Sequence, residues 1–220
     1  MDSYFANERP EMQAFLPAGS LGRTLEIGCA GGNFSAALNA TERWGVEPFP
    51  DAAAAARAKG INALTGIYSD VEAQLPAGHF DLIVANDVIE HMPDHEAFLR
   101  AVKAKLAPGG RILISVPNIR HLPTLFDLVV RRDWRYAPDG VLDHTHLRFF
   151  TRKSLTRCMD ECGYEIEAFA GLCSLFRAGA SRKKALACAA LIGATLGHAW
   201  DTQYLQFGLL VRPRQRSEAL

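Results

Sequence analysis

Short apolar runs alternate with stretches of helical periodicity along almost the whole chain. The run at residues 80–85 is nearly continuous, which is typical of a central strand covered by helices on both faces. Strands that alternate with helices predict a doubly wound α/β fold with a mostly parallel sheet. Seven strands are expected, at residues 24–27, 44–47, 61–64, 80–85, 111–116, 164–169 and 205–211.

The helical stretches lie between these strands, and several carry their own start and stop signals. Asp94 is placed to cap a helix whose apolar stripe includes Phe98 and Leu99, and the P-G-G sequence at 108–110 is expected to end it. An extra C-terminal helix, at about residues 181–200, is expected between the last two strands. Other helices are expected at 33–40, 51–59, 122–130 and 155–162.

A length of 220 residues suits a single domain. Within it, residues 1–20 are expected to form a helical lead-in. Residues 117–155 and 172–203 are expected to be insertions on the substrate side or at an oligomer contact.

The charge and the cysteine content limit the classes of partner and the compartment that we expect. The chain has 24 Lys and Arg residues against 24 Asp and Glu residues, so its net charge is zero and no nucleic-acid partner is expected. The first residues lack the pattern of a secretory signal, and the five cysteines are expected to be free thiols in a cytoplasmic protein. Cys158 and Cys162 lie one helical turn apart without a second ligand pair, so no metal site is expected.

A cluster of small residues, G-C-A-G-G at 28–32, follows the first strand. Ligands of open α/β sheets bind at the carboxyl ends of the strands, where small residues let the backbone approach closely. A dinucleotide fingerprint would need glycines in place of Ala30 and Asn33, which disfavours a dehydrogenase. The spacing E-x-G-x-(G/A)-x-G fits instead, through Glu26, Gly28, Ala30 and Gly32.

Three further features follow in order along the chain. Glu47 ends the second strand, 19 residues beyond Gly28, where a carboxylate can accept hydrogen bonds from two ribose hydroxyls. The segments N-D-V-I-E-H at 86–91 and L-A-P-G-G-R-I-L at 106–113 come next. Together these segments resemble class I S-adenosylmethionine-dependent methyltransferases over residues 20–170. The resemblance implies a Rossmann-like methyltransferase fold, S-adenosylmethionine as cofactor and methyl transfer as the reaction.

The resemblance also assigns roles to single residues. Glu26 is expected to orient the amino-acid end of the cofactor, above the small residues Gly28, Ala30 and Gly32, while Glu47 binds the ribose. Asp70 is expected to receive the adenine amino group. Asn86 and Asp87 are expected to line the pocket, with Asp87 also a candidate catalytic residue. Glu90 and His91 are expected to stabilise the local turn.

The segment D-H-T-H-L-R-F-F-T at 143–151 resembles a bacterial subgroup of methyltransferases associated with sugar or cell-surface glycan modification. Alternate residues of an extended chain share a face, so His144 and His146 are expected to point the same way. Either histidine is a candidate base for an oxygen acceptor. The alternative is that one histidine is structural and that Arg148 pairs with a carboxylate.

Two other segments leave alternatives open. Arg131, Arg132 and Arg135, with Trp134 and Tyr136 between and beside them, suit phosphate and sugar groups or form a solvated helix end. Residues 185–200 carry no charged side chain apart from His198, which indicates a buried helix or a homodimer contact, with a membrane-surface helix as the alternative.

We therefore expect a small-molecule methyltransferase. A cofactor-binding protein without turnover and an RNA or protein methyltransferase are the alternatives.

Overall fold

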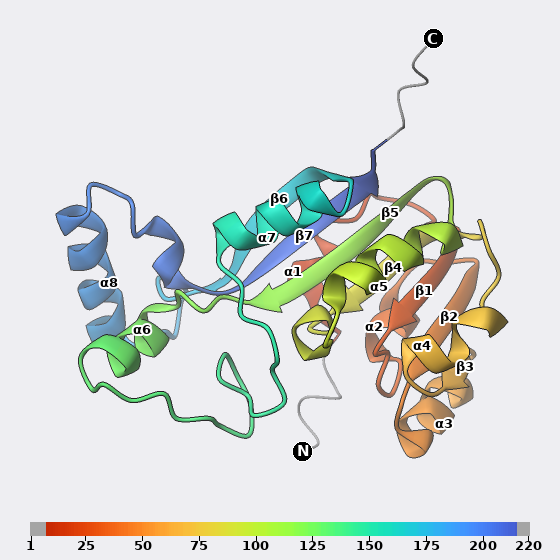
Figure 1. Ribbon diagram of the computed structural model, residues 1–220, viewed down its shortest axis with the longest axis horizontal. Helices are drawn as coiled ribbons and strands as arrows, with labels where there is room; N and C mark the ends of the chain where they lie inside the picture. The colour runs from red at the N-terminus through yellow and green to blue at the C-terminus, as the bar shows by residue number, and fades with distance from the viewer. Residues whose placement is uncertain (1–7, 215–220) are drawn as a thin grey trace, which may run out of the picture.

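The computed structural model describes residues 8–214, in which seven strands form one sheet in the order β3-β2-β1-β4-β5-β7-β6 (Figure 1). Neighbouring strands from β3 to β5 pair in parallel, and β7 lies antiparallel between β5 and β6. This confirms the doubly wound, mostly parallel sheet. The strands are β1 (Arg23–Ile27), β2 (Glu42–Glu47), β3 (Asn62–Thr65), β4 (Phe80–Asn86), β5 (Leu106–Pro117), β6 (Tyr164–Ser174) and β7 (Tyr204–Pro213).

Helices cover both faces of the sheet, as Figure 1 shows for α5 and α7 on the near face. The core on that side includes residues of α4, α5 and α7, whereas the core on the other side includes residues of α1 and α2. The helices are α1 (Pro10–Gln13), α2 (Asn33–Ala37), α3 (Pro50–Ala58), α4 (Tyr68–Val71), α5 (His95–Ala101), α6 (Leu122–Val129), α7 (Arg152–Glu161) and α8 (Arg182–Ala194).

The central strand β4 is apolar at most positions because both of its faces are covered. Ile83 and Ala85 pack into the core beneath α5 and α7, and Leu82 and Val84 pack into the core on the opposite face. Side chains alternate between the faces of a strand, so a strand covered on both sides carries apolar residues at its buried positions, while Asp81 at its partly exposed start pairs with Arg23.

The segment after α5 differs from the expectation. Asp94 caps α5, because its Oδ1 accepts a hydrogen bond from the Ala97 amide at 2.8 Å. The P-G-G sequence does not end that helix, however, since α5 stops at Ala101 and β5 already begins at Leu106. Gly110 lies where a Cβ would come within 2.8 Å of the Phe80 carbonyl oxygen, so the glycine permits close pairing with β4 at an irregular register.

The insertions gather at one end of the molecule, where α6 and α8 lie beside each other (Figure 1). The extra helix between β6 and β7 is confirmed as α8, but it ends at Ala194. The exposure of α8 contradicts the expectation of a buried helix. Cys188 is its buried residue, whereas Leu186 is 72% exposed and Leu196, just beyond the helix, is 90% exposed. A homodimer or membrane-surface contact there stays a prediction, as does the single-domain organisation.

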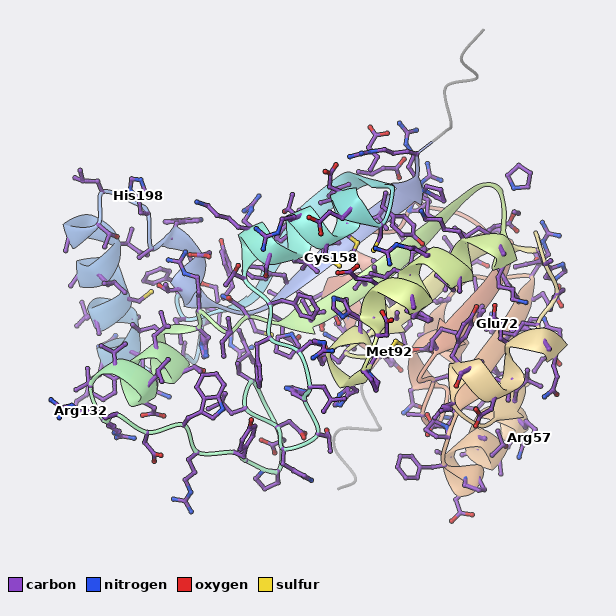
Figure 2. All side chains as sticks on the ribbon, viewed as in Figure 1. Arg57, Glu72, Met92, Arg132, Cys158 and His198 are labelled. Carbon is purple, nitrogen blue, oxygen red and sulfur yellow. The ribbon has the colours of Figure 1, made fainter. Side chains whose placement is uncertain are left out.

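Three smaller expectations also have outcomes. Cys158, which lies on α7 in Figure 2, and Cys162 are buried free thiols packed in the core. Of the helical lead-in, α1 is described, while residues 1–7 lie outside the described part of the chain. Within residues 8–214, none of the helices combines the length and apolar character needed to cross a bilayer.

Candidate functional site

The loop after β1 has a left-handed backbone at three alternate positions. Gly28, Ala30 and Gly32 have φ values of 70°, 47° and 75°. A Cβ on Gly32 would lie 2.4 Å from the Ile61 side chain, so both conformation and space require glycine there. The Gly28 amide donates to the Val46 carbonyl at 2.8 Å, which folds the loop against the end of β2. The helix α2 begins directly after the loop, at Asn33.

Glu47 lies beside this loop and is only 3% exposed. Its Oε2 accepts a hydrogen bond from the Ala30 amide at 2.8 Å, and its Oε1 accepts one from the Phe49 amide at 3.0 Å. A carboxylate oxygen can accept two hydrogen bonds, so each oxygen keeps capacity for a hydroxyl donor. This arrangement suits the ribose-binding role proposed for Glu47.

Glu26 lies near the end of β1 and is 5% exposed. Its Oε2 accepts hydrogen bonds from the amide and the hydroxyl of Ser35, at 3.2 and 2.6 Å. Burial raises the pKa of Glu26 to about 7, although the Ser35 hydrogen bonds act in the opposite direction. A positively charged group beside Glu26 would favour its ionised form.

Asn86 ends β4, and both polar atoms of its side chain are buried without a hydrogen-bond partner among residues 8–214. Buried amides are almost always hydrogen-bonded, since leaving one unsatisfied lowers the stability of the folded protein by about 1–3 kcal/mol. The unsatisfied amide therefore indicates a position that a ligand completes. Asp70, in contrast, is exposed on α4 and receives a hydrogen bond from the neighbouring Ser69 hydroxyl.

Asp87 follows Asn86 with a left-handed backbone, φ 53°. Its Oδ2 accepts a hydrogen bond from Arg9 at 2.6 Å, and its Oδ1 accepts one from the Ser115 hydroxyl at 2.9 Å. Gln206 donates to both oxygens at 3.3 and 3.2 Å and accepts from Arg9 at 2.8 Å. Because its charge is held by these partners, Asp87 suits a positioning role better than proton removal.

Arg9, Ser115 and Gln206 are site residues that the sequence reasoning missed. They come from the start of the chain, from β5 and from β7. Ser115 and Gln206 are polar residues inside apolar strands, which is a signal that could have identified them. Arg9 carries no comparable signal, because isolated arginines near a chain terminus are common.

The two candidate histidines do not share a face, so that expectation is wrong. Residues 144 and 145 form a turn, across which the His146 amide donates to the Asp143 carbonyl at 3.0 Å. His146 is 8% exposed, whereas the His144 side chain is 66% exposed. A turn removes the alternation of an extended chain, and His146 is the member of the pair that points inward.

His146 meets the end of the N-D-V-I-E-H segment. Its ring lies 4.7 Å from the His91 ring, and Glu90, His91 and His146 each offer a ligand atom within 4.8 Å of the others. The Glu90 carbonyl accepts hydrogen bonds from the amides of Leu147 and Arg148, at 2.8 and 3.0 Å, so its backbone stabilises the turn as expected. The Glu90 side chain does not, since both oxygens are buried without a partner among residues 8–214.

An aromatic series extends from this cluster. Phe149 lies 6.5 Å from the His146 ring, and Trp134 lies 5.2 Å from Phe149, in edge-to-face contacts. Arg131, Arg132 and Arg135 are all exposed, and Arg131 pairs with Asp127 at 2.8 Å. The aromatic residues thus approach the histidine cluster, while the arginines face solvent.

Comparison with known proteins decides the family. Residues 4–168 match the family described as "Methyltransferase domain". The chain belongs to this family. It is 28% identical over 168 residues to the ubiquinone biosynthesis O-methyltransferase of Xanthomonas axonopodis pv. citri, across 71% of this chain and 67% of the relative.

A second relative and a solved structure agree with this. The chain is 32% identical over 124 residues to the trans-aconitate 2-methyltransferase of Azoarcus sp., across 52% of this chain and 48% of the relative, so the match spans about half of that protein. The fold resembles a crystal structure of an S-adenosylmethionine-dependent methyltransferase from Mesorhizobium loti, with a TM-score of 0.62 at 19% identity, covering 93% of this chain and 97% of that one.

The predicted class of enzyme and its cofactor are thereby confirmed. The residues of this methyltransferase fit S-adenosylmethionine on structural grounds as well. Among residues 8–214, Glu26 is a buried carboxylate without a cationic partner in hydrogen-bond contact, Glu47 keeps hydrogen-bonding capacity, and the Asn86 amide is unsatisfied. These three groups lie at the ends of β1, β2 and β4, which are neighbours in the sheet.

Proposed function

We propose that this methyltransferase methylates a hydroxyl oxygen of a small, ring-bearing acceptor. The observation that carries the proposal is the turn after β4. Within six residues it places the unsatisfied amide of Asn86, on the cofactor side, and the Glu90–His91 pair, which meets the inward-facing His146. One turn thus joins a cofactor-binding group to a cluster able to activate an acceptor.

The cofactor side rests on four residues. Glu26 holds the amino-acid end of S-adenosylmethionine, and Glu47 accepts hydrogen bonds from its ribose. Asn86 binds the cofactor through its otherwise unsatisfied side-chain amide. Bound S-adenosylmethionine supplies a methyl group on a positively charged sulfur, so the protein mainly positions the acceptor. Asp70 is assigned to the adenine amino group, although its exposed place on α4 requires that the ligand reach outward over that helix.

The acceptor side rests on His146. Its Nδ1 lies 3.1 Å from the Val141 carbonyl oxygen, which can only accept a hydrogen bond, so Nδ1 carries the proton. In the neutral ring Nε2 then has an unshared electron pair, which assists removal of a proton from the acceptor hydroxyl. His144, exposed at the surface, is assigned a contact with the acceptor. Asp87 positions the turn through its contacts with Arg9 and Ser115.

Two observations support an oxygen on a ring. Phe149 and Trp134 extend the histidine cluster with aromatic surface, which suits the face of a sugar or of an aromatic ring. The ubiquinone relative is named an O-methyltransferase. Sugars and glycan-linked groups remain the acceptor class that the segment 143–151 indicates.

The test incubates the enzyme and methyl-labelled S-adenosylmethionine with fractionated extract of the source cell, followed by mass spectrometry of labelled products. A labelled methyl ether on a small ring compound is the expected result. Label in RNA or protein would overturn the small-molecule assignment. Cofactor binding without any labelled product would favour a binding protein.

A further inference from the structure

Glu90 is an unusual buried carboxylate. It is 0% exposed, and neither side-chain oxygen has a hydrogen-bond partner among residues 8–214. Burial, reinforced by the negative charge of Asp87, raises the pKa of Glu90 well above its ordinary value. A buried carboxylate normally needs a partner, since ionising it in an apolar environment is unfavourable. Something other than the hydrogen-bond donors of residues 8–214 must therefore satisfy it, either a proton or a cation.

The two histidines beside Glu90 offer further electron pairs rather than protons. The Nδ1 of His146 donates to the Val141 carbonyl oxygen at 3.1 Å. The Nδ1 of His91 lies 3.3 Å from the Thr145 carbonyl oxygen, which again fixes it as the donor. Each neutral ring then has its unshared electron pair on Nε2.

The groups that hold the His91 ring are themselves fixed by hydrogen bonds. The Thr145 hydroxyl lies 3.0 Å from His91 Nδ1 and donates to Asp143 Oδ1 at 2.7 Å, while the Thr145 amide donates to the same oxygen at 2.7 Å. Histidines that bind metals commonly donate their second ring N–H to a carbonyl, carboxylate or hydroxyl group that fixes the ring. Both His91 and His146 have such a partner.

From this convergence of electron pairs we propose that Glu90, His91 and His146 bind a divalent metal ion. The ligand atoms lie within 4.8 Å of one another. Ligands placed 2.0–2.2 Å from one ion are separated by about 3–4 Å, so small side-chain rotations complete the site. One carboxylate and two imidazoles suit zinc, manganese, iron or cobalt, and leave coordination positions open. This proposal replaces the expectation of no metal site, which considered only Cys158 and Cys162.

The metal ion gives the acceptor side of the proposed function a specific chemistry, and this part of the inference rests on that function. An open coordination position can take the acceptor's hydroxyl oxygen. A bound divalent ion lowers the pKa of such an oxygen, so the proton is released to water at neutral pH. His146 then assists proton removal as a ligand of the ion.

The test uses the full chain, stripped of metals and titrated separately with Zn²⁺, Mn²⁺ and Co²⁺ by calorimetry. Glu90→Gln keeps the size of the side chain but removes the charge, and His146→Ala removes an imidazole. His198→Ala is the matched control, because His198 is exposed beside α8. It lies far from Met92, the residue that follows His91 in the sequence (Figure 2). We expect one ion per chain in the native protein and in the control, and a more than ~10-fold loss of affinity in the two cluster variants.

The same titrations at several pH values test whether the Glu90 carboxylate takes part. Metal ligands bind in their deprotonated forms, so affinity should rise with pH, and binding should release protons. Glu90→Gln should lower the number of protons released. If His146→Ala does not fold, Glu90→Gln decides the question alone.

Binding of S-adenosylmethionine, measured on the same samples, separates the two proposals. A protein that binds the cofactor but no metal ion, or a Glu90→Gln variant that binds metal as tightly as the native chain, overturns the metal site and leaves the proposed function intact. A protein that binds metal but no cofactor overturns the proposed function instead.

Discussion

The backbone amide of Ala30 donates a hydrogen bond to Oε2 of Glu47 at 2.8 Å. This contact joins the loop after β1 to the end of β2, and it holds Ala30 in a left-handed conformation, φ 47°, without the freedom of glycine. One carboxylate therefore shapes this loop, and its remaining electron pairs are the ones that we propose bind the ribose.

We accordingly expect Glu47→Ala to weaken S-adenosylmethionine binding by more than tenfold. Hydrogen bonds to a charged group contribute about 1.5–3 kcal/mol each, and two of them are lost, together with the support of Ala30. Calorimetry on the folded variant measures the change. Glu161→Ala, at the exposed end of α7, is the control and should bind normally. An unchanged affinity in folded Glu47→Ala would show that the ribose lies elsewhere.

Glu26 should make cofactor binding depend on pH. Burial raises its pKa to about 7 from an ordinary value of 4.5, so the folded chain without ligand holds a proton there that the unfolded chain releases. The contribution of Glu26 to stability therefore falls as pH rises from about 4.5 to about 7. In the proposed role the ionised form pairs with the cofactor's ammonium group, so affinity should rise between pH 6 and pH 8.

Glu26→Gln tests both the stability effect and the affinity effect, because it removes the ionisable group without changing the size of the side chain. Its affinity for S-adenosylmethionine should be lower at pH 8 and nearly independent of pH. Without ligand, the thermal unfolding temperature of Glu26→Gln should not fall between about pH 4.5 and pH 7 in the way that Glu26 makes it fall in the native protein. A pH profile of binding that is the same in both proteins would contradict this role.

Arg9 and Asp87 should behave as a coupled pair. Their side chains are 12% and 11% exposed, so Arg9→Met leaves Asp87 charged and mostly buried. Breaking such a pair costs about 3 kcal/mol, whereas the exposed pair of Arg212 with Glu165 should contribute less than about 1 kcal/mol. Denaturant unfolding of Arg9→Met, with Arg212→Met as control, measures the difference.

A double variant, Arg9→Met with Asp87→Asn, completes the cycle. It should be more stable than the sum of the two single changes predicts, because the neutral amide that replaces the Asp87 carboxylate needs no cationic partner. Strict additivity would mean that Arg9 stabilises the protein through its other contacts.

His146→Ala should lower turnover far more than His144→Ala. His146 is inward-facing in the cluster with Glu90 and His91, whereas His144 is largely exposed. Loss of a group that assists proton removal typically lowers the rate by 10²–10⁴-fold, while an exposed contact should mainly raise the acceptor's KM. Steady-state kinetics with the identified acceptor measures both, and cofactor affinity should stay normal. Native turnover in both variants would mean that neither histidine takes part in proton removal.

Local patterns predicted the sheet well, because apolar runs and their spacing reflect burial directly. The sequence also indicated the loop after β1 that we propose binds the cofactor, since Glu26, Gly28, Ala30 and Gly32 lie close together in sequence. The extent of α5 was wrong because Gly110 belongs to a strand pairing that only the fold reveals. Local spacing could not show the turn that separates His144 from His146, which depends on hydrogen bonds of residues 143–147.

The acceptor side was harder to predict for a related reason. Glu90 and His91 meet His146 across a long stretch of chain, and each alone is compatible with a structural role. Only their placement together shows that Glu90 lacks a donor among residues 8–214 and that both rings direct electron pairs into the cluster. Arg9 is a similar case, because its partners lie on β5, on β7 and directly after β4.

The hydrogen bond from Arg9 to Gln206 joins residues 197 positions apart. This hydrogen bond can form only after β7 has been synthesised, whereas the contacts of Arg9 with Asp87 and Ser115 do not depend on β7. Contacts between such distant residues form late, since a long loop must be closed first. The hydrogen-bond network around Asp87 is thus completed only when β7 joins the sheet, so the turn after β4 gains its last side-chain contacts at that step.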